Sequence, residues 1–527
     1  MHERMSRREF VSTVSGLVVA APALVGLTRK GGHAIAGGYV DDQSAAGHAL
    51  RDGRAFAAAP ERRRASVAIV GGGMGGLSAA WQLDRSGVDD WVLLELANDV
   101  GGNARSGANA VSRYPWGAHY VPVPSADATH VRALLRELGL LNADGTWDER
   151  TLCHSPQERI FQHGRWHEGL QPLDALPKPE LAQFAEFESR MDDWRASEAF
   201  AVPSIPGHAR GMAGARAPAV RALDALTADQ WLREQRLTSP ALRWWVEYGT
   251  RDDYGASLQQ VSAWAAVHYF AGRGSEDEGP LTWPEGNDWI VRRLVERLNT
   301  KRSGRVVTGA PAWRIERAGA RWVVRTPRLD VECDAVIWAS PLFVLPRVLS
   351  SVKLPVTVEY APWVVANLTL SRAPHERGAS LAWDNVIYGS PSLGYVNAMH
   401  QSLATPSSQL VWTWYHAVVD RPAREARAWM QQRPWSEWRD QIITDLSRAH
   451  PDIVDCITRI DVMRWGHAMA RPVPGLLSRV AALSQWQPAE RVYVAHADMS
   501  GLSLFEEAQW HGVRAADVVA RVMKGTR

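Results

Sequence analysis

Lysine is scarce in this chain, and neither sign of charge dominates it. The only lysines are Lys30, Lys178, Lys301, Lys353 and Lys524, and 57 acidic residues nearly balance the 59 basic ones. The formal net charge of +2 leaves no basic field of the kind that binding to a polyphosphate requires. We therefore expect no nucleic acid partner, and each of the rare lysines becomes a candidate for a specific role.

Cysteine and long apolar runs are also scarce. Cys153, Cys333 and Cys456 lie far apart and show no C-x-x-C or Cys/His spacing, so the sequence predicts no disulfide framework and no metal site. The body of the chain has no stretch of about 20 apolar residues, which argues against a membrane span there. Its 527 residues and 46% hydrophobic content are instead typical of a globular protein with two or three domains.

The N-terminus has the order of an export signal. Ser6-Arg7-Arg8-Glu9-Phe10-Val11 begins a weakly apolar run to Leu27, and Ala34-Ile35-Ala36 offers a small-residue cleavage site. Paired arginines before a modest apolar segment resemble a twin-arginine (Tat) signal, which exports folded proteins. We expect residues 1–36 to be this signal, the Tat export machinery to be a partner, and the protein to be periplasmic or otherwise exported. An uncleaved signal acting as a membrane anchor is the alternative.

Hydrophobic periodicity predicts an α/β chain with two interleaved domains. Residues 37–64 read as a flexible lead-in, with order beginning near Ala65. A Rossmann-like nucleotide-binding domain is expected to take residues 65–124, 281–345 and 471–527. The mostly helical residues 125–280 and the mixed residues 346–470 are expected to form an α+β substrate domain.

A glycine motif near the start of the first domain predicts a dinucleotide site. Gly71, Gly73 and Gly76 form G-x-G-x-x-G between the strand Ser66–Val70 and a helix. The first glycine permits a tight turn, the second lets the backbone approach a pyrophosphate, and the third lets helix and strand pack closely. Glu95 ends the next strand, where an acidic side chain accepts hydrogen bonds from ribose hydroxyls.

The segment Gly101-Gly102-Asn103-Ala104-Arg105-Ser106 resembles the G-G-R-x-x-T/S element of the superfamily of flavin amine oxidases, protoporphyrinogen oxidases and phytoene desaturases. In that superfamily the element lies against FAD. Asn103 stands at the usual Arg position, and we expect Arg105 to supply the positive charge.

Four further segments extend the resemblance. They are the Tyr114–Tyr120 loop with its G-x-H at Gly117-Ala118-His119, the P-x-G-G-like Trp283–Asn287, the A-x-P strand end at Ala339-Ser340-Pro341, and the C-terminal run Val492–Ala516. In the superfamily the C-terminal acidic residue, here Asp498, meets the ribityl and pyrophosphate part of FAD. Ala497 replaces the usual Gly before it.

The resemblance implies an FAD site shared between the two ends of the chain. The expected cofactor-binding residues are Gly71, Gly73, Met74, Gly75, Gly76, Glu95, Gly102, Asn103, Arg105, Gly117, Ala118, His119, Ala312, Asp498, Glu507 and Ala508.

For catalysis, the resemblance implies hydride transfer from a substrate to flavin N5. Lys353, which follows the A-x-P strand, is the candidate for the lysine that holds a water at N5 in amine oxidases, with a solvated surface lysine as the alternative. His119 is the second candidate, since a histidine suits proton removal near neutral pH. Trp116, Trp283, Trp510 and His511 are candidate cavity walls. Arg251-Asp252-Asp253-Tyr254 is either a site for a charged substrate group or a surface ion-pair cluster, the latter being favoured.

The first hypothesis is therefore an FAD-dependent oxidoreductase that oxidises an amine, either a polyamine or an amino acid, with oxygen or a respiratory carrier as electron acceptor. A desaturase or dehydrogenase of a polycyclic or polyene substrate is the second hypothesis, and an apolar cavity would favour it. A periplasmic flavoprotein without turnover is the third.

Overall fold

The computed structural model describes residues 34–40, 44–54, 56–273, 279–403 and 407–525. Residues 1–34 form one unit and residues 35–527 another. The expected signal therefore lies outside the described residues, apart from Ala34, Ile35 and Ala36. No helix in the described part of the chain is both long enough and apolar enough to cross a membrane.

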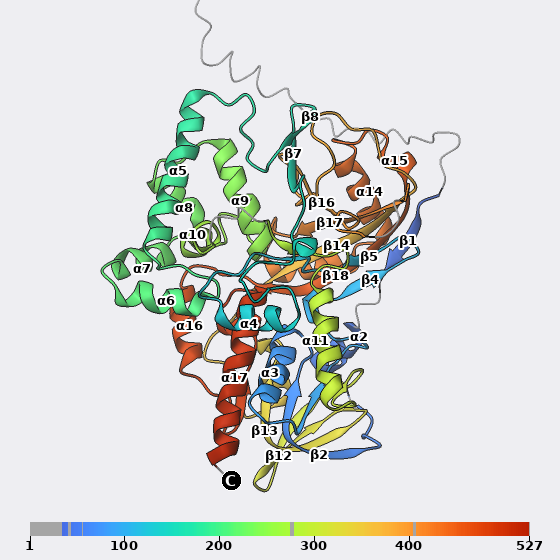
Figure 1. Cartoon of the computed structure of the whole chain (residues 1–527), viewed down its shortest axis with the longest axis vertical. Coiled ribbons are helices and arrows are strands. Elements are labelled where there is room, and N and C mark those ends of the chain that lie inside the picture. The colour runs from blue at the N-terminus through green and yellow to red at the C-terminus, as the bar shows by residue number, and fades with distance from the viewer. Residues whose placement is uncertain (1–33, 41–43, 55, 274–278, 404–406, 526–527) are drawn as a thin grey trace, which may run out of the picture. The chain divides into compact units, whose positions relative to one another are not determined.

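The predicted βαβ unit is present and belongs to a seven-stranded sheet (Figure 1). Its path is β10 (Val306–Val307), β3 (Trp91–Leu94), β2 (Arg62–Val70), β13 (Asp330–Trp338), β12 (Arg321–Arg325) and β11 (Arg314–Ala318), and β19 (Val492–Val494) also pairs with β13. Strands β10, β3, β2, β13 and β19 run parallel, and all four residues of β3 are buried. Continuous apolar runs of this kind are typical of parallel strands that are covered on both faces.

Helices cover both faces of this sheet. They are α3 (Met74–Arg85), α4 (Thr129–Glu137), α11 (Asp288–Lys301) and α17 (Phe505–Gly525) in one apolar core, and α12 (Leu345–Val348) in the other. Helix α4 lies in the expected substrate segment but packs into this sheet's core, because Val131, Leu134 and Leu135 face it.

The second sheet has eight strands and is mainly antiparallel. Its order is β1 (Ala36–Tyr39), β18 (Ile457–Ala470), β14 (Tyr360–Leu370), β17 (Leu410–Ala417), β16 (Tyr395–Asn397), β15 (Asp384–Ile387), β7 (Glu158–Gln162) and β8 (Arg165–Glu168). Helices α13 (Ala423–Gln432), α14 (Trp435–Leu446) and α15 (Ile453–Cys456) pack in its core. Two short pairs, β4 (Ser106–Ala108) with β5 (Arg113–Pro115) and β6 (Tyr120–Val121) with β9 (Leu281–Thr282), complete the strands.

A helical cluster flanks the second sheet and appears in green in Figure 1. It consists of α5 (Lys178–Ala196), α6 (Ser204–Ala213), α7 (Ala217–Ala225), α8 (Ala228–Glu234), α9 (Pro240–Tyr254) and α10 (Ala263–Ala271), joined by the C-terminal α16 (Leu476–Ser484). The mostly helical character expected for residues 125–280 is therefore present. The hairpin β7–β8 was not foreseen there, because its polar residues break the strand alternation.

The expectation of a flexible lead-in over residues 37–64 is wrong. Strand β1 pairs in parallel with β18, and α2 (Ser44–Arg51) follows it. The guanidinium of Arg464 lies over the ring of Tyr39, 3.8 Å from the ring centre. Tertiary contacts of this kind override a local sequence that carries no periodic signal.

Close backbone contacts join α3 to the C-terminal part of the chain, which includes α17. A Cβ at Gly512 would lie 2.3 Å from the carbonyl oxygen of Gly75, and a Cβ at Gly75 would lie 2.1 Å from the carbonyl oxygen of Ala495. Only glycine fits at either position, because a backbone oxygen cannot move aside as a flexible side chain can.

We expect Gly512→Val to lower the free energy of unfolding by roughly 3 kcal/mol, because overpacking forces the two helices apart. Gly525→Ala on the same helix is the matched control: its Cβ would meet nothing within 4 Å, and we expect a change below about 1 kcal/mol. Denaturant unfolding measures both. Equal effects of the two substitutions would show that the α3–α17 contact is not tight.

Candidate functional site

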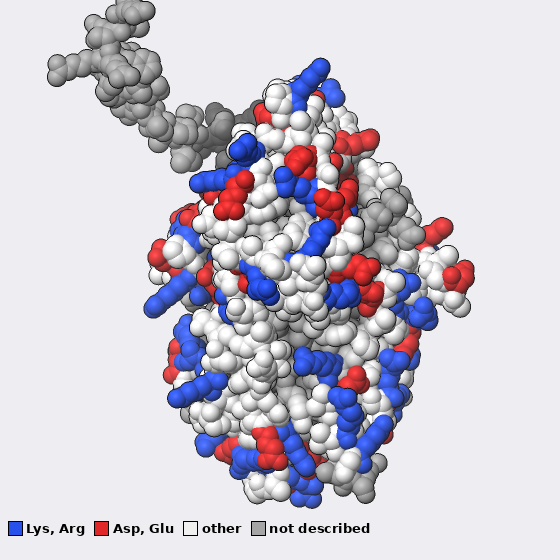
Figure 2. Space-filling model, turned by 90° about the vertical axis from the view of Figure 1, so that its left-hand side faces the viewer, with Lys and Arg blue, Asp and Glu red and all other residues white. Residues whose placement is uncertain are grey.

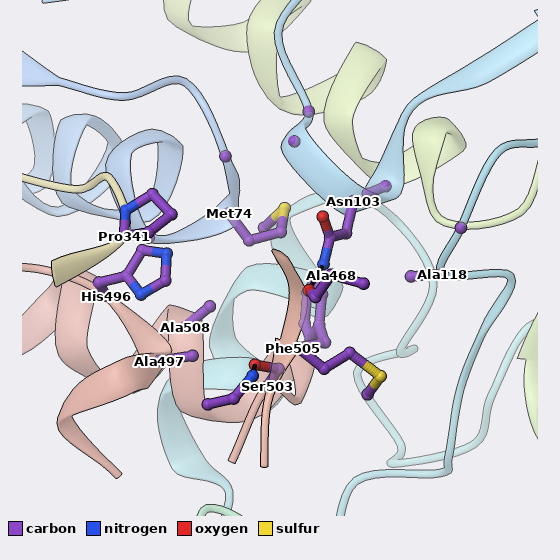
Figure 3. Close-up of a pocket in the computed structure, with 18 of the residues that line it drawn as sticks. Met74, Asn103, Ala118, Pro341, Ala468, His496, Ala497, Ser503, Phe505 and Ala508 are labelled. Carbon is purple, nitrogen blue, oxygen red and sulfur yellow. Dashed lines mark hydrogen bonds between the residues drawn. The ribbon is translucent and has the colours of Figure 1, made fainter. Parts of the chain in front are cut away.

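A cavity of about 450 Å³ lies where the two sheets and α17 meet (Figure 3). Its walls combine the glycine turn after β2, the loops that carry Asn103 and His119, the end of β13, the end of β18 and the start of α17. Met74 and Asn103 approach it from the N-terminal part of the chain, and His496 and Phe505 from the C-terminal part (Figure 3). Sequence segments about 400 residues apart thus form one site.

The turn after β2 leaves open space beside the start of a helix. Gly71 has φ +114°, and a Cβ there would lie 2.6 Å from the carbonyl oxygen of Ala339. A Cβ on Gly76 would lie 1.9 Å from the carbonyl oxygen of Gly71, whereas a Cβ on Gly73 would meet nothing within 4 Å. Gly73 is the N-cap of α3 and its cap has no side-chain hydrogen bond, so the helix start is free to bind phosphate oxygens.

Glu95, directly after β3, is positioned by the backbone. Its carboxylate accepts hydrogen bonds from the N–H groups of Gly72 at 2.6 Å and of Ala97 at 2.8 Å. Burial raises the pKa of Glu95. Each carboxylate oxygen keeps a second lone pair, which suits ribose hydroxyls that approach from the cavity.

Asp498 presents an unused acceptor at the C-terminal side of the site. Its Oδ2 accepts hydrogen bonds from the Leu342 N–H at 2.8 Å and the Tyr360 hydroxyl at 2.5 Å. The Oδ1 atom is buried and has no hydrogen-bond partner within the described part of the chain. Nδ1 of His496 lies 3.2 Å from Oδ1, and the backbone N–H of Asp498 donates to this nitrogen. A ligand hydroxyl fits this position, as the ribityl chain of FAD would.

Burial opposes ionisation of Asp498, but His496 and the hydrogen bonds from Leu342 and Tyr360 outweigh it and lower its pKa. The carboxylate is therefore ionised at neutral pH and acts only as an acceptor.

Most of the expected cofactor-binding residues line the cavity. Those that do are Gly71, Gly73, Met74, Gly75, Glu95, Gly102, Asn103, Gly117, Ala118, His119, Ala312, Asp498 and Ala508. Asn103 also donates a hydrogen bond from Nδ2 to the Ala468 carbonyl oxygen at 2.5 Å (Figure 3). This bond connects the loop that carries Asn103 to β18.

Three expected cofactor residues are placed differently. Gly76 acts through packing against Gly71, as described. Arg105 lies with its guanidinium 5.1 Å from the centre of the Trp465 ring and does not line the cavity. Glu507 faces the interior, where it accepts hydrogen bonds from Ser500 and from the backbone of Ser204.

Lys353 also lies outside the site. It is exposed on the segment between α12 and β14 and does not line the cavity. Distance along the chain after the A-x-P strand did not predict which way this segment turns. No lysine lines the cavity within the described residues, so Lys353 is withdrawn as a catalytic candidate.

His119 stands in an aromatic wall of the cavity. Its ring stacks on Tyr415 at 4.8 Å between ring centres and lies 5.0 Å from Tyr120 and 5.5 Å from Trp383. Burial lowers the pKa of His119 to about 4, so the imidazole is neutral at neutral pH. Trp116, Trp283, Trp510 and His511, the expected walls, do not line this cavity, and Trp338, Trp363 and Trp465 do.

The far end of the cavity, formed by Asp252, Asp253, Arg273 and Glu506 and called the acidic end below, is rich in carboxyl groups. The preference for a surface ion-pair cluster at residues 251–254 is therefore wrong: Arg251, Asp253 and Tyr254 are buried, and α9 carries both aspartates to the cavity wall. Arg273 pairs with Asp253 at 2.7 Å.

Two other carboxyl groups of the acidic end share the charge of Arg273 without forming an ion pair with it. Burial raises the pKa of Asp252 to about 7, with the charge of Asp253 adding to the effect and that of Arg273 opposing it. Burial also raises the pKa of Glu506 to about 7, although the charge of Arg273 opposes the shift. The hydroxyl of Tyr120 approaches Asp252 Oδ2 at 3.4 Å, which is a long hydrogen bond. A cation placed here would add positive charge to a group of carboxyls that one Arg273 compensates only in part.

Sequence reasoning missed Arg273 and Glu506. No motif marks Arg273. Glu506 and Glu507 are neighbours, and only the phase of α17, which starts at Phe505, decides which of them faces the cavity.

The geometry at Gly73 yields a test of the cofactor site. We expect Gly73→Val to leave the stability of the apo-protein unchanged, because its backbone (φ −74°) is open to any residue and its Cβ meets open space. The added methyl groups occupy the space for the pyrophosphate, so FAD affinity should fall by about 100-fold or more, or roughly 3 kcal/mol. Titration of apo-protein with FAD and thermal unfolding measure the two quantities. Unchanged FAD affinity would contradict this placement of the phosphates.

Comparison with known proteins agrees with this geometry. Residues 74–520 match the family of flavin containing amine oxidoreductases. The search of curated proteins finds no match. Similar solved structures include wild-type putrescine oxidase bound to putrescine (TM-score 0.66, 18% identity, 87% of this chain and 100% of that chain covered) and cyclohexylamine oxidase from Brevibacterium oxydans IH-35A (TM-score 0.63, 16% identity, 87% and 99% covered). A conjugated-linoleic-acid-producing (CLA-producing) fatty acid isomerase from P. acnes has a TM-score of 0.59 at 16% identity, with 87% and 98% covered.

At these identities the structural likeness shows the fold alone, and the family match extends over most of the chain. The glycine turn, the open helix start and the unused Asp498 oxygen fit FAD. The chain belongs to the flavin-containing amine oxidoreductase family and is an FAD-dependent oxidoreductase.

Proposed function

We propose that this protein oxidises a small amine with at least two cationic groups, a diamine or polyamine. The observation that carries the proposal is the acidic end of the cavity, where three carboxyl groups, Asp252, Asp253 and Glu506, share the single cation Arg273 among the described lining residues, and Arg273 forms its ion pair with Asp253. An ammonium group supplies the missing charge and three hydrogen-bond donors. An amino acid fits less well, because the guanidinium that would bind its carboxylate is already paired.

The residues of the site divide the work of such a reaction. Bound FAD supplies a two-electron acceptor for the hydride of a carbon–hydrogen bond. Asp252, with a pKa of about 7, is present in both protonation states near neutral pH. It binds the substrate ammonium as a carboxylate and takes one proton from it, leaving the neutral amine that hydride loss requires. His119 and Tyr415, stacked on each other, form an aromatic wall that excludes water from the substrate.

The two other hypotheses are less well supported. A desaturase of a polyene or polycyclic substrate calls for an apolar cavity, and the acidic end is costly to desolvate against such a molecule. A flavoprotein without turnover calls for a closed site, whereas this cavity continues beyond the cofactor-binding residues to Asp252. Oxygen or a respiratory carrier is the proposed final electron acceptor.

We further propose that the protein is exported through the twin-arginine pathway to the periplasm or beyond. The arginine pair and the apolar run of the N-terminal sequence support this proposal. A cofactor-filled core built from both chain ends favours a route that carries folded proteins.

Lys and Arg are interspersed with Asp and Glu on the face shown in Figure 2, in keeping with a protein that binds no polyanion.

Anaerobic mixing of the FAD-loaded protein with diamines, amino acids and porphyrinogens tests the substrate class. We expect diamines to bleach the flavin absorbance, with a rate that rises as pH increases through about 7 because Asp252 must be ionised to bind and deprotonate the ammonium. Asp252→Asn should remove this pH dependence and weaken amine binding about 10- to 100-fold, the value of a hydrogen bond to a charged group.

Lys353→Met is the control for this experiment and should leave the rate unchanged, since Lys353 is exposed outside the cavity. Bleaching by porphyrinogens alone would favour the desaturase hypothesis. Silence of the whole panel would favour a flavoprotein without turnover.

Export is tested by the double substitution of Arg7→Lys and Arg8→Lys. We expect the variant to accumulate in the cytoplasm with its flavin bound, because the two substituted arginines are not part of the unit of residues 35–527. Cell fractionation with flavin fluorescence as the readout measures this. Unchanged delivery of the variant to the periplasm would rule out the twin-arginine route.

A further inference from the structure

Asn287 lines the cavity, and its side chain has a buried, unused acceptor. Asn287 stands where the P-x-G-G segment of the family has its second glycine, and only 1% of it is exposed. Its Nδ2 donates a hydrogen bond to the carbonyl oxygen of Tyr120 at 2.9 Å. This bond fixes which end of the amide is the oxygen, because a carbonyl oxygen cannot donate to another. The Oδ1 atom has no partner among the residues that the structure describes.

An acceptor left in this state is expensive. An amide oxygen that is buried without a hydrogen bond loses its bonds to water and gains none in return, and buried polar groups in proteins nearly always have a partner. A glycine at this position would carry no such cost. Since the chain supplies no partner within its described part, the partner is expected in the cavity that Asn287 lines.

Backbone contacts hold Asn287 rigidly against the His119 loop. Its N–H donates to the carbonyl oxygen of Ala118 at 3.1 Å. A Cβ on the preceding Gly286 (φ +62°) would lie 2.8 Å from that same oxygen and from the Cα of His119. The backbone that carries the amide therefore cannot shift without moving the loop that forms the aromatic wall.

The position also connects Asn287 to the acidic end. Tyr120, whose carbonyl oxygen it binds, directs its hydroxyl to Asp252. Oδ1 is a neutral acceptor, so it binds an N–H group without adding negative charge to a cavity that already holds Asp252, Asp253 and Glu506.

We propose that Asn287 is a further ligand-binding residue, whose Oδ1 accepts a hydrogen bond from an N–H group of the molecule bound beside the His119 loop. Two molecules bring such a group to this cavity: the flavin ring through its imide N–H, and the substrate through its ammonium. The first source depends only on the FAD site, and the second rests on the proposed function.

Two substitutions separate the acceptor from the donor of this side chain. Asn287→Leu removes both, whereas Asn287→Asp removes the donor and keeps an acceptor. Asn367 offers a matched control, because its Nδ2 likewise holds a carbonyl oxygen of this loop, that of Pro115 at 3.0 Å, while its Oδ1 is satisfied by the Thr413 hydroxyl at 2.7 Å. Asn367 does not line the cavity.

Each variant is titrated with FAD as the apo-protein and with a diamine as the anaerobic holoprotein, and thermal unfolding checks its folding. We expect Asn287→Leu to raise one of the two dissociation constants about tenfold, and Asn287→Asp to keep it within about threefold, because an acceptor remains. The Leu and Asp variants of Asn367 should change neither constant by more than twofold. A rise in the FAD constant identifies the flavin ring as the partner, and a rise in the diamine constant alone identifies the ammonium.

The proposal is overturned if both constants for Asn287→Leu stay within twofold of the wild type, or if the corresponding Leu variant of Asn367 weakens binding equally. Should Asn287→Leu fail to fold, Asn287→Gly restores the family's glycine and takes its place. If no amine reduces the wild-type flavin, the proposed function fails on its own, and the FAD titration alone decides whether Asn287 binds the cofactor.

Discussion

The contact of α3 with α17 determines where everything else in this protein lies. Helix α3 starts at the phosphate-binding turn and α17 starts at the acidic end, so packing them glycine against backbone brings the two ends of the chain to one cavity. The parallel pairing of β13 with both β2 and β19 makes the same connection within the sheet. The long intervening segments are then free to build the second sheet and the helical cluster that close the cavity.

Electrostatics divides this cavity into two halves with different tasks. Around the glycine turn the protein offers N–H donors and a helix start, which suit phosphates. Around Asp252 it offers carboxyl groups, and burial raises the pKa of Asp252 and of Glu506 to about 7. Burying such groups costs free energy, and the binding of a positively charged group offsets that cost. Sites that hold carboxyl groups near neutral pKa are poised for proton transfer, in keeping with the family's chemistry.

The cofactor half was readable from the sequence because its chemistry is local. The turn needs Gly71 for its positive φ and Gly76 for its close contact with the backbone. Both requirements therefore appear within one short stretch of sequence. The strands and helices around it followed from periodicity, to within a few residues. Strand β1 was missed because a short strand of Ala, Gly and Tyr draws its stability from its neighbour β18.

The acidic end could not be predicted from the sequence, because its residues converge from α9, the segment after α10 and α17 without sharing a motif. Lys353 was chosen by its distance along the chain, and the fold turns its segment outward. Asp252 and Asp253 were noticed but ranked as surface residues, since a charged run on a helix is usually solvated. Whether Glu506 or Glu507 faces the cavity depends on the residue at which α17 starts. A start one residue earlier or later would exchange the directions of the two side chains.

The central claim is that segments from the N-terminal and C-terminal parts of the chain bind one FAD molecule in a single cavity. The most direct measurement is the flavin content of the purified full-length chain, obtained by releasing the cofactor with denaturant and identifying it by mass and absorbance. We predict one FAD per chain. Colourless protein that neither releases a flavin nor takes one up would contradict the account.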